Sequence, residues 1–117
     1  REVGMRETQL LKGVLDGCVL QIIAKEDIYG YELVQRLKAA GFTNIVAGTV
    51  YPLLQKLEKK EMITSCMKPS PDGPPRKYFQ ITVKGEAYLA DFWDEWHGLV
   101  NKVSNLEEDR TNAKYSQ

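Results

Sequence analysis

The sequence lacks most of the residue patterns on which enzymes and metal sensors depend. It contains two cysteines, Cys18 and Cys66, without Cys-x-x-Cys spacing, and a single histidine, His97. A metal site needs several such ligands at short spacing, and a nucleophile needs a neighbouring base. A glycine-rich phosphate loop is also missing. The sequence therefore predicts no catalytic residues, no metal ligands and no cofactor.

Long apolar runs are absent as well. No segment approaches the roughly 20 apolar residues of a membrane-spanning helix, and no signal-peptide pattern opens the sequence. Cys18 falls on the apolar face of a predicted helix, so we interpret it as a core thiol. Isolated thiols are typical of proteins from reducing compartments. We therefore expect a cytoplasmic protein with one modest core and no membrane contact.

Charge is balanced over the whole chain but is unevenly distributed along it. Residues 56–84 contain seven basic and three acidic side chains, a net charge of +4. Residues 85–109 contain one basic and seven acidic side chains, a net charge of −6. A polyanion would be attracted to the first segment and repelled by the second. The asymmetry favours an oriented nucleic-acid surface, with ordinary solvated surface as the alternative.

Apolar periodicity predicts two amphipathic helices at the start of the chain. The first spans residues 8–25, with Thr8 as its candidate N-cap and apolar residues at i, i+3, i+4 and i+7. The second spans residues 30–40 and stops at Gly41, a favoured residue after a helix. Residues 42–45 form a short connector that could include one brief strand.

A third helix and a hairpin follow. The helix begins near residues 47–49, and Pro52 limits how much earlier it can start, since proline is tolerated only in the first turn. Residues 63–68 are predicted to form a strand, residues 69–75 a stiff loop with four prolines, and residues 76–81 the partner strand. Three helices and a hairpin form a winged helix-turn-helix. The predicted fold class is therefore α+β, mostly α, with the third helix in the reading position.

A long last helix is predicted over residues 83–109, with Thr82 as its N-cap and residues 110–117 as a frayed tail. Its apolar residues repeat at spacings of three and four, the pattern of a coiled-coil seam. The seam consists of Leu89, Phe92, Trp96, Leu99, Val103 and Leu106. A second copy of the chain would supply its partner helix, whereas packing on the chain's own first helix is the alternative, and both contacts can coexist. We therefore expect a DNA-binding domain over residues 8–82, a dimerisation helix and a homodimer.

The exposed side of the third helix carries side chains suited to reading DNA. Gln55 can pair with adenine, Lys56 with guanine or phosphate, and Tyr51 with a thymine methyl group or a phosphate. The hairpin cations would contact phosphates or the minor groove, and the helix that follows Tyr29 can bind a phosphate at its N-terminus. The predicted DNA-binding residues are Tyr29, Thr49, Tyr51, Pro52, Gln55, Lys56, Lys59, Lys68, Arg76 and Lys77.

Two segments resemble the PadR family of bacterial transcriptional regulators. The first is Gly48-Thr-Val-Tyr-Pro-Leu-Leu-Gln-Lys-Leu-Glu58, and the second is Gly73-Pro-Pro-Arg-Lys-Tyr-Phe-Gln-Ile-Thr82. The resemblance covers residues 11–106 and implies a dimeric repressor that reads a palindromic operator in double-stranded DNA. It also implies a dimer formed through the first and last helices. The single C-terminal helix is similar to that of the compact subfamily.

In some compact members, an aromatic residue of the last helix lines a pore at the dimer centre and stacks on flat ligands. The resemblance assigns that position to Trp96, and it implies a planar aromatic effector bound by Leu15, Phe92, Trp96 and Val100. The sequence departs from this pattern at Trp93 and at Gly98, which costs a helix about 1 kcal/mol against alanine. A filled aromatic interface is therefore the alternative to a ligand pocket. For the whole protein, a winged-helix module that binds protein instead of DNA is the alternative to a repressor.

Overall fold

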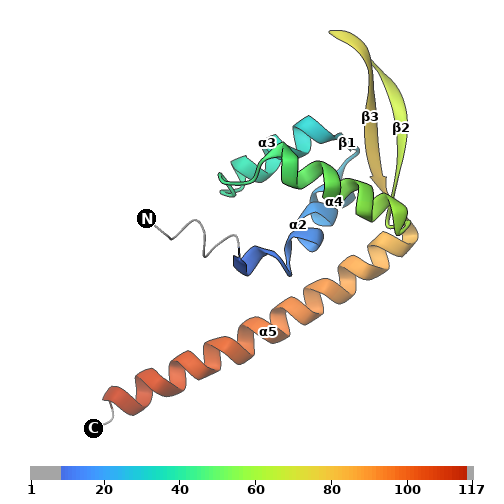
Figure 1. Ribbon diagram of the computed structural model, residues 1–117. Helices are drawn as coiled ribbons and strands as arrows, with labels where there is room; N and C mark the ends of the chain where they lie inside the picture. The colour runs from blue at the N-terminus through green and yellow to red at the C-terminus, as the bar shows by residue number, and fades with distance from the viewer. Residues whose placement is uncertain (1–8, 116–117) are drawn as a thin grey trace.

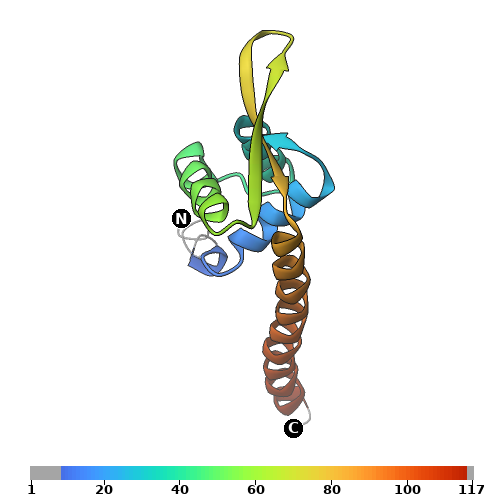
Figure 2. The same cartoon turned by 90° about the vertical axis from the view of Figure 1, so that its right-hand side faces the viewer.

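Two elements project from the helical body of this protein, as the computed structural model shows for residues 9–115 (Figure 1). In chain order the elements are α2 (Leu15–Lys25), β1 (Ile28–Tyr29), α3 (Gly30–Ala39), α4 (Ala47–Lys59), β2 (Ile63–Ser70), β3 (Gly73–Ile81) and α5 (Val83–Tyr115). The β2–β3 hairpin, called the wing below, and the long helix α5 leave the body in opposite directions from a common base (Figure 2). This arrangement is the predicted winged helix with a long C-terminal helix.

The first predicted helix is interrupted, which corrects the expectation of one continuous helix from residue 8. Residues 9–11 are helical, residues 12–14 form a turn, and α2 begins only at Leu15. Gly13 lies in this turn, and glycine weakens a helix interior because it loses the most backbone entropy when it is fixed. Thr8, the expected N-cap, lies outside the described residues.

The second and third predicted helices agree with the structure. α3 ends at Ala39, and Gly41 follows with φ of 109°, a left-handed conformation that glycine adopts without strain. α4 begins at Ala47, within the expected range, although Pro52 lies inside the helix rather than in its first turn. Residues 42–45 contain turns and no strand. A two-residue strand, β1, lies instead between α2 and α3.

The three strands form an antiparallel sheet in the order β1-β3-β2. β1 pairs with β3 only at Ile28–Phe79 and Tyr29–Tyr78. β2 and β3 pair from their base almost to the tip, so the expected loop over residues 69–75 is wrong and the turn comprises residues 71–72. Proline is tolerated in these strands because the outer hairpin has free edges, and the register shifts beside Pro69.

The hydrophobic core lies between the helices of the body and the base of the sheet. Each helix contributes fully buried side chains, among them Val19 from α2, Leu33 from α3 and Leu57 from α4. Ile63 and Phe79 add the core-facing side chains of the sheet. Removing such apolar surface from water contributes about 1.5–3 kcal/mol per large side chain. The core therefore fixes α4 and the base of the wing on one scaffold.

Only the first part of α5 packs against this scaffold. The Thr82 hydroxyl accepts a hydrogen bond from the backbone N–H of Gly85 at 3.0 Å, which confirms the predicted N-cap. Leu89 is 8% exposed and belongs to the core. Beyond it the helix continues to Tyr115, so residues 110–115, which were expected to form a frayed tail, are helical.

Candidate nucleic-acid interface

The outward side of α4 is built by the same periodicity that builds the core. Val50, Leu53, Leu54 and Leu57 are buried beneath the helix. The side chains between them are consequently turned to the surface, because successive residues of an α-helix differ by about 100°. The exposed set consists of Thr49, Tyr51, Pro52, Gln55, Lys56 and Lys59. α4 therefore presents a polar and aromatic surface on a rigid base.

A cavity of about 410 Å³ lies between α4, the start of α3 and the wing. Its lining combines aromatic, amide and cationic side chains, and consists of Tyr29, Gly30, Tyr31, Tyr51, Leu54, Gln55, Glu58, Arg76, Lys77 and Phe79. The first N–H groups of a helix lack partners within it, so the start of α3 offers hydrogen-bond donors to an anion. Tyr31 lines the cavity with an exposed ring.

Gly30 allows the close approach between α3 and α4 at this cavity. The ring of Tyr51 occupies the space that a side chain at residue 30 would need. Tyr51 is therefore held against the start of α3, even though it remains 44% exposed. The phenol group is thus fixed at the wall of the cavity.

The three cations of the wing have different partners. The guanidinium of Arg76 lies 4.4 Å from the centroid of the Tyr29 ring. The Lys68 ammonium lies 3.0 Å from Asp27, and the Lys77 ammonium lies 3.1 Å from Glu58. Lys68 pairs with Arg76 across the hairpin, so these two share one face and Lys77 lies on the other, as strand alternation predicts.

Lys56 lies on the opposite flank of α4. Its ammonium is 2.8 Å from the carboxylate of Asp16 on α2. Together with Thr49 and Pro52 it lines a second cavity of about 410 Å³, whose apolar side includes Leu15. The structure thus brings Tyr29, Tyr51, Gln55, Arg76 and Lys77 to one cavity, and it places Thr49, Pro52 and Lys56 at another.

Two carboxylates that the sequence analysis did not single out hold the wing. Hydrogen bonds from Gln80 and Lys68 lower the pKa of Asp27, and hydrogen bonds from Ser65 and Lys77 lower the pKa of Glu58. Asp27 in turn raises the pKa of Lys68. A hydrogen bond donated to an ionised carboxylate stabilises the charged form. No sequence signal points to these pairs, because the partners lie on different elements and meet only in the folded chain.

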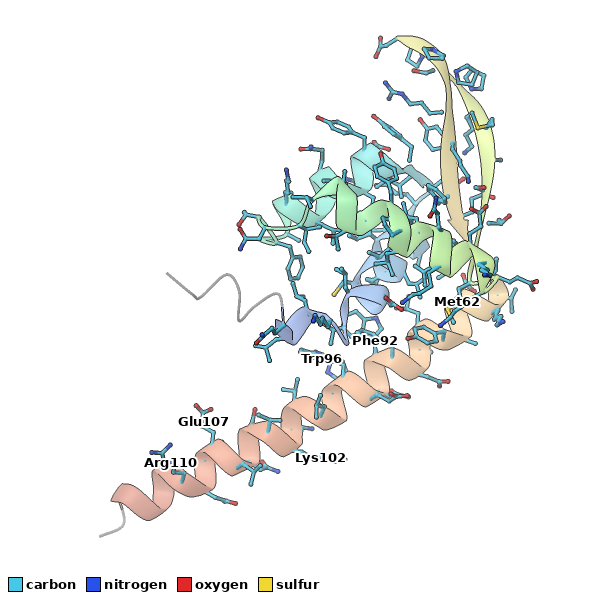
Figure 3. The ribbon with its side chains drawn as sticks, viewed as in Figure 1. Met62, Phe92, Trp96, Lys102, Glu107 and Arg110 are labelled. Atoms are coloured by element: carbon cyan, nitrogen blue, oxygen red, sulfur yellow. The ribbon has the colours of Figure 1, made fainter. Side chains whose placement is uncertain are left out.

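The predicted seam of α5 is divided between two environments. Leu89 and Phe92 pack on the chain's own body, as the alternative interpretation expected. Trp96 is 36% exposed and Leu99 is 53% exposed, and exposure rises to 72% at Leu106. Figure 3 shows Phe92 and Trp96 on the side of α5 that faces α2, whereas Lys102, Glu107 and Arg110 lie on the projecting part. Val100 and Val103 are also exposed, so the distal seam presents an apolar stripe to solvent.

Trp93, at which the sequence departs from the pattern of the compact subfamily, contacts α2 of the same chain. Its indole N–H donates a hydrogen bond of 2.8 Å to the side-chain oxygen of Gln21 on α2. The ring also stacks on His97 with centroids 6.0 Å apart. Trp93 therefore fastens α5 to α2, while Trp96, on the neighbouring face, keeps part of its surface free.

Other kinds of site find no support in the described part of the chain. No cluster of three or more His, Cys, Asp or Glu side chains there could hold a metal ion. No helix of residues 9–115 is long and apolar enough to cross a membrane.

Comparisons with known proteins agree with this geometry. The family model "Transcriptional regulator PadR-like family" matches residues 19–91. A Streptococcus transcriptional regulator of known crystal structure is 56% identical to this chain in sequence. The match covers 85% of this chain and 97% of the regulator's chain, with a TM-score of 0.79. A PadR-like transcriptional regulator from Bacillus cereus is 46% identical over 84% of this chain and 95% of its own, with a TM-score of 0.78.

A third structure contains DNA. Bacillus subtilis PadR, solved in complex with operator DNA, is 24% identical, covers 68% of this chain and 45% of its own, and superposes with a TM-score of 0.62. At this identity the likeness concerns the fold alone. The winged-helix arrangement described above is therefore shared with a protein that was crystallised on its operator.

Proposed function

Because this chain belongs to the PadR-like family of transcriptional regulators, we propose that it binds double-stranded operator DNA and represses transcription in the cytoplasm. The cavity between α4, α3 and the wing carries this proposal. It brings Tyr51 and Gln55 of α4 together with Arg76 and Lys77 of the wing beside the N-terminus of α3. These groups suit a phosphate backbone and the base edges next to it.

In this proposal α4 enters the major groove and the wing follows the backbone. Gln55 reads a base edge, since an amide can donate to and accept from adenine together. Tyr51 and the first N–H groups of α3 bind a phosphate, and Arg76 binds a neighbouring phosphate or the minor groove. Thr49, Pro52, Lys56, Lys59 and Lys68 complete the interface. Lys56 and Lys68 would then exchange a carboxylate partner for phosphate.

We further propose that the protein acts as a homodimer held by the distal seam of α5. The exposed residues Leu99, Val103 and Leu106 continue the spacing of the buried Leu89 and the half-buried Phe92. An apolar stripe of this size is stable in water when a second stripe covers it. Two winged helices at a fixed distance would read a palindrome.

A planar aromatic effector fits the same interface. Phe92 and Trp96 face α2, and Trp96 and Val100 keep part of their surface exposed. In a dimer these side chains would lie near the partner helix, where a flat ligand could stack on the indole. Titration of tryptophan fluorescence with planar aromatic compounds tests this idea. Quenching should disappear in Trp96→Ala, and quenching that survives in this variant would assign the effect to Trp93 instead.

Selection of binding sites from a random pool of DNA duplexes tests the central proposal. The protein should enrich a palindrome, and Gln55→Ala should relax the preference at one base pair in each half-site, a loss of about 1–3 kcal/mol. Lys102→Ala, on the projecting part of α5, is the control and should enrich the wild-type sequence. Failure of the wild type to enrich any sequence would refute specific operator binding and favour a module that binds protein.

A further inference from the structure

The outer part of the wing extends well beyond the body (Figure 1). Among the described strands, β1 contributes only two pairs to β3, the outer one at Tyr29 and Tyr78. From Lys77 to the tip, β2 and β3 pair only with each other. An isolated two-stranded hairpin is marginally stable in water, and it is free to bend at its base. Contacts other than backbone pairing must therefore set the angle between the wing and α4.

Glu58 of α4 provides one such contact. Its carboxylate accepts a hydrogen bond of 2.6 Å from the Ser65 hydroxyl on β2 and one of 3.1 Å from the Lys77 ammonium on β3. A single side chain of the reading helix thus binds both strands of the wing. Ser65 and Lys77 share one face of the hairpin, as their register shows.

Asp27 provides a matching contact on the other face. Its Oδ2 accepts hydrogen bonds from Lys68 on β2 at 3.0 Å and from Gln80 on β3 at 2.7 Å. Asp27 precedes β1, so it belongs to the body and not to the wing. The hairpin is therefore held on both faces by carboxylates of the body, and each carboxylate binds both strands.

Each carboxylate binds one neutral donor and one lysine. If Lys77 or Lys68 transfers to a DNA phosphate, the Ser65 or Gln80 hydrogen bond can persist and the wing stays attached. Hydrogen bonds to an ionised carboxylate are about twice as strong as neutral ones. Both carboxyl groups are ionised at neutral pH, as ordinary Asp and Glu side chains are, and these hydrogen bonds lower their pKa values further.

We propose that Asp27 and Glu58 are positioning residues that fix the angle between the wing and α4, and that they thereby determine operator specificity without touching DNA. This inference rests on the proposed operator binding. It makes a counter-intuitive prediction about charge. Removing an acidic side chain near DNA ordinarily strengthens binding to any duplex, because it removes a repulsion. Removing either of these two should weaken binding to the operator.

The DNA experiment compares Glu58→Ala and Asp27→Ala with Asp72→Asn, which removes an acidic charge at the tip of the wing. The two alanine variants should bind a selected operator about tenfold more weakly, a loss on the scale of one charged hydrogen bond. Their binding to an unrelated duplex should stay equal or rise. Asp72→Asn should bind both duplexes as tightly as the wild type or more tightly. Equal or increased operator affinity in both alanine variants would overturn the proposal.

Conservative variants separate positioning from a general loss of structure. Glu58→Gln and Asp27→Asn keep an oxygen that can accept the hydrogen bond from Ser65 or Gln80. They should recover a large part of the ratio between operator and unrelated DNA. A ratio as low as that of the alanine variants would show that charge, and not attachment of the wing, is responsible.

A measurement without DNA distinguishes failure of this inference from failure of the proposed function. Relaxation of ¹⁵N amides over residues 66–77 should report lower order parameters in Glu58→Ala and Asp27→Ala than in the wild type. Unchanged order parameters would refute the positioning role whatever the DNA results are. If the wild type selects no operator, the proposed function fails, and the relaxation data alone decide whether Asp27 and Glu58 hold the wing.

Discussion

The ring of Phe92 on α5 lies directly against Gly17 of α2, in the space where any larger residue would place its Cβ. This contact brings the last helix close enough to the first for Trp93 to reach Gln21. It also explains why the proximal part of the seam is covered within a single chain. The attachment of α5 to the body therefore depends on a residue without a side chain.

Gly17→Ala should destabilise the fold, although alanine is the better helix former. The added methyl group overlaps the Phe92 ring, and such overpacking costs about 1–3 kcal/mol. Gly98→Ala is the matched control, because, apart from its chain neighbours and the backbone of its own helix, no atom of the described residues lies within 4 Å of the position that its methyl group would take. This control should stabilise α5 by up to about 1 kcal/mol. Urea unfolding followed by circular dichroism measures both, and equal stability of the two variants would contradict the packing argument.

Arg76→Ala should weaken binding to all DNA sequences and reduce its salt dependence. Among the residues that the structure describes, Arg76 forms no ion pair, and its guanidinium stacks on Tyr29. Arg76 can therefore bind a phosphate without first leaving a carboxylate partner. The slope of log K against log salt should fall by about one. Fluorescence anisotropy at several salt concentrations measures this slope, and Lys102→Ala should leave it unchanged.

The wing contacts should lose their stabilising effect in acid. The pKa values of Asp27 and Glu58 are lowered in the folded protein, so the folded state binds protons more weakly than the unfolded chain. Their contribution to stability is complete above the unfolded pKa, and it is lost as the pH falls through the folded pKa. The wild type should exceed an Asp27→Asn and Glu58→Gln double variant in unfolding free energy at about pH 7, and by less at about pH 3. A difference independent of pH would contradict the ionic origin of these contacts.

Leu99→Glu should convert the proposed dimer into monomers. Leu99 lies on the exposed distal seam, and a buried, unpaired carboxylate in an interface costs far more than the lost apolar contact. Asn101→Glu adds the same charge at a position outside the seam and should leave the dimer intact. Sedimentation velocity distinguishes the two states. A monomeric wild type would contradict the dimer itself, whereas a dimeric Leu99→Glu would place the interface elsewhere.

Local sequence signals predicted the parts of the fold that local chemistry determines. The apolar stripe beneath α4, the stop at Gly41 and the cap at Thr82 each depend on a few neighbouring residues. The break before Leu15 and the strands through the prolines were not predicted. At the break, Gly13 weakens a helix that the apolar periodicity alone would continue. In the hairpin, pairing between the strands outweighed turn propensity.

The candidate site was predicted only in part, for a related reason. Periodicity identified the side chains of α4 that face outward, and strand alternation separated Arg76 from Lys77. Neither pattern could show that Asp27 contacts Lys68 and Gln80, because these residues approach one another only after the sheet has formed. The heptad spacing likewise could not show that Leu89 is covered by the chain's own core.

Thr82 joins α4, the wing and α5 at a single point. Its hydroxyl donates to the carbonyl of Glu61 at the end of α4 and accepts from Gly85 in the first turn of α5, and its backbone continues directly from β3. The reading helix, the wing and α5 therefore share one root, and Leu89 and Trp93 hold the next turns of α5 rigidly on the body. In a dimer, a small change in the crossing angle of the two α5 helices would therefore rotate both winged helices together. A ligand between the two α5 helices would need to touch neither DNA-binding surface in order to change the spacing that DNA must match.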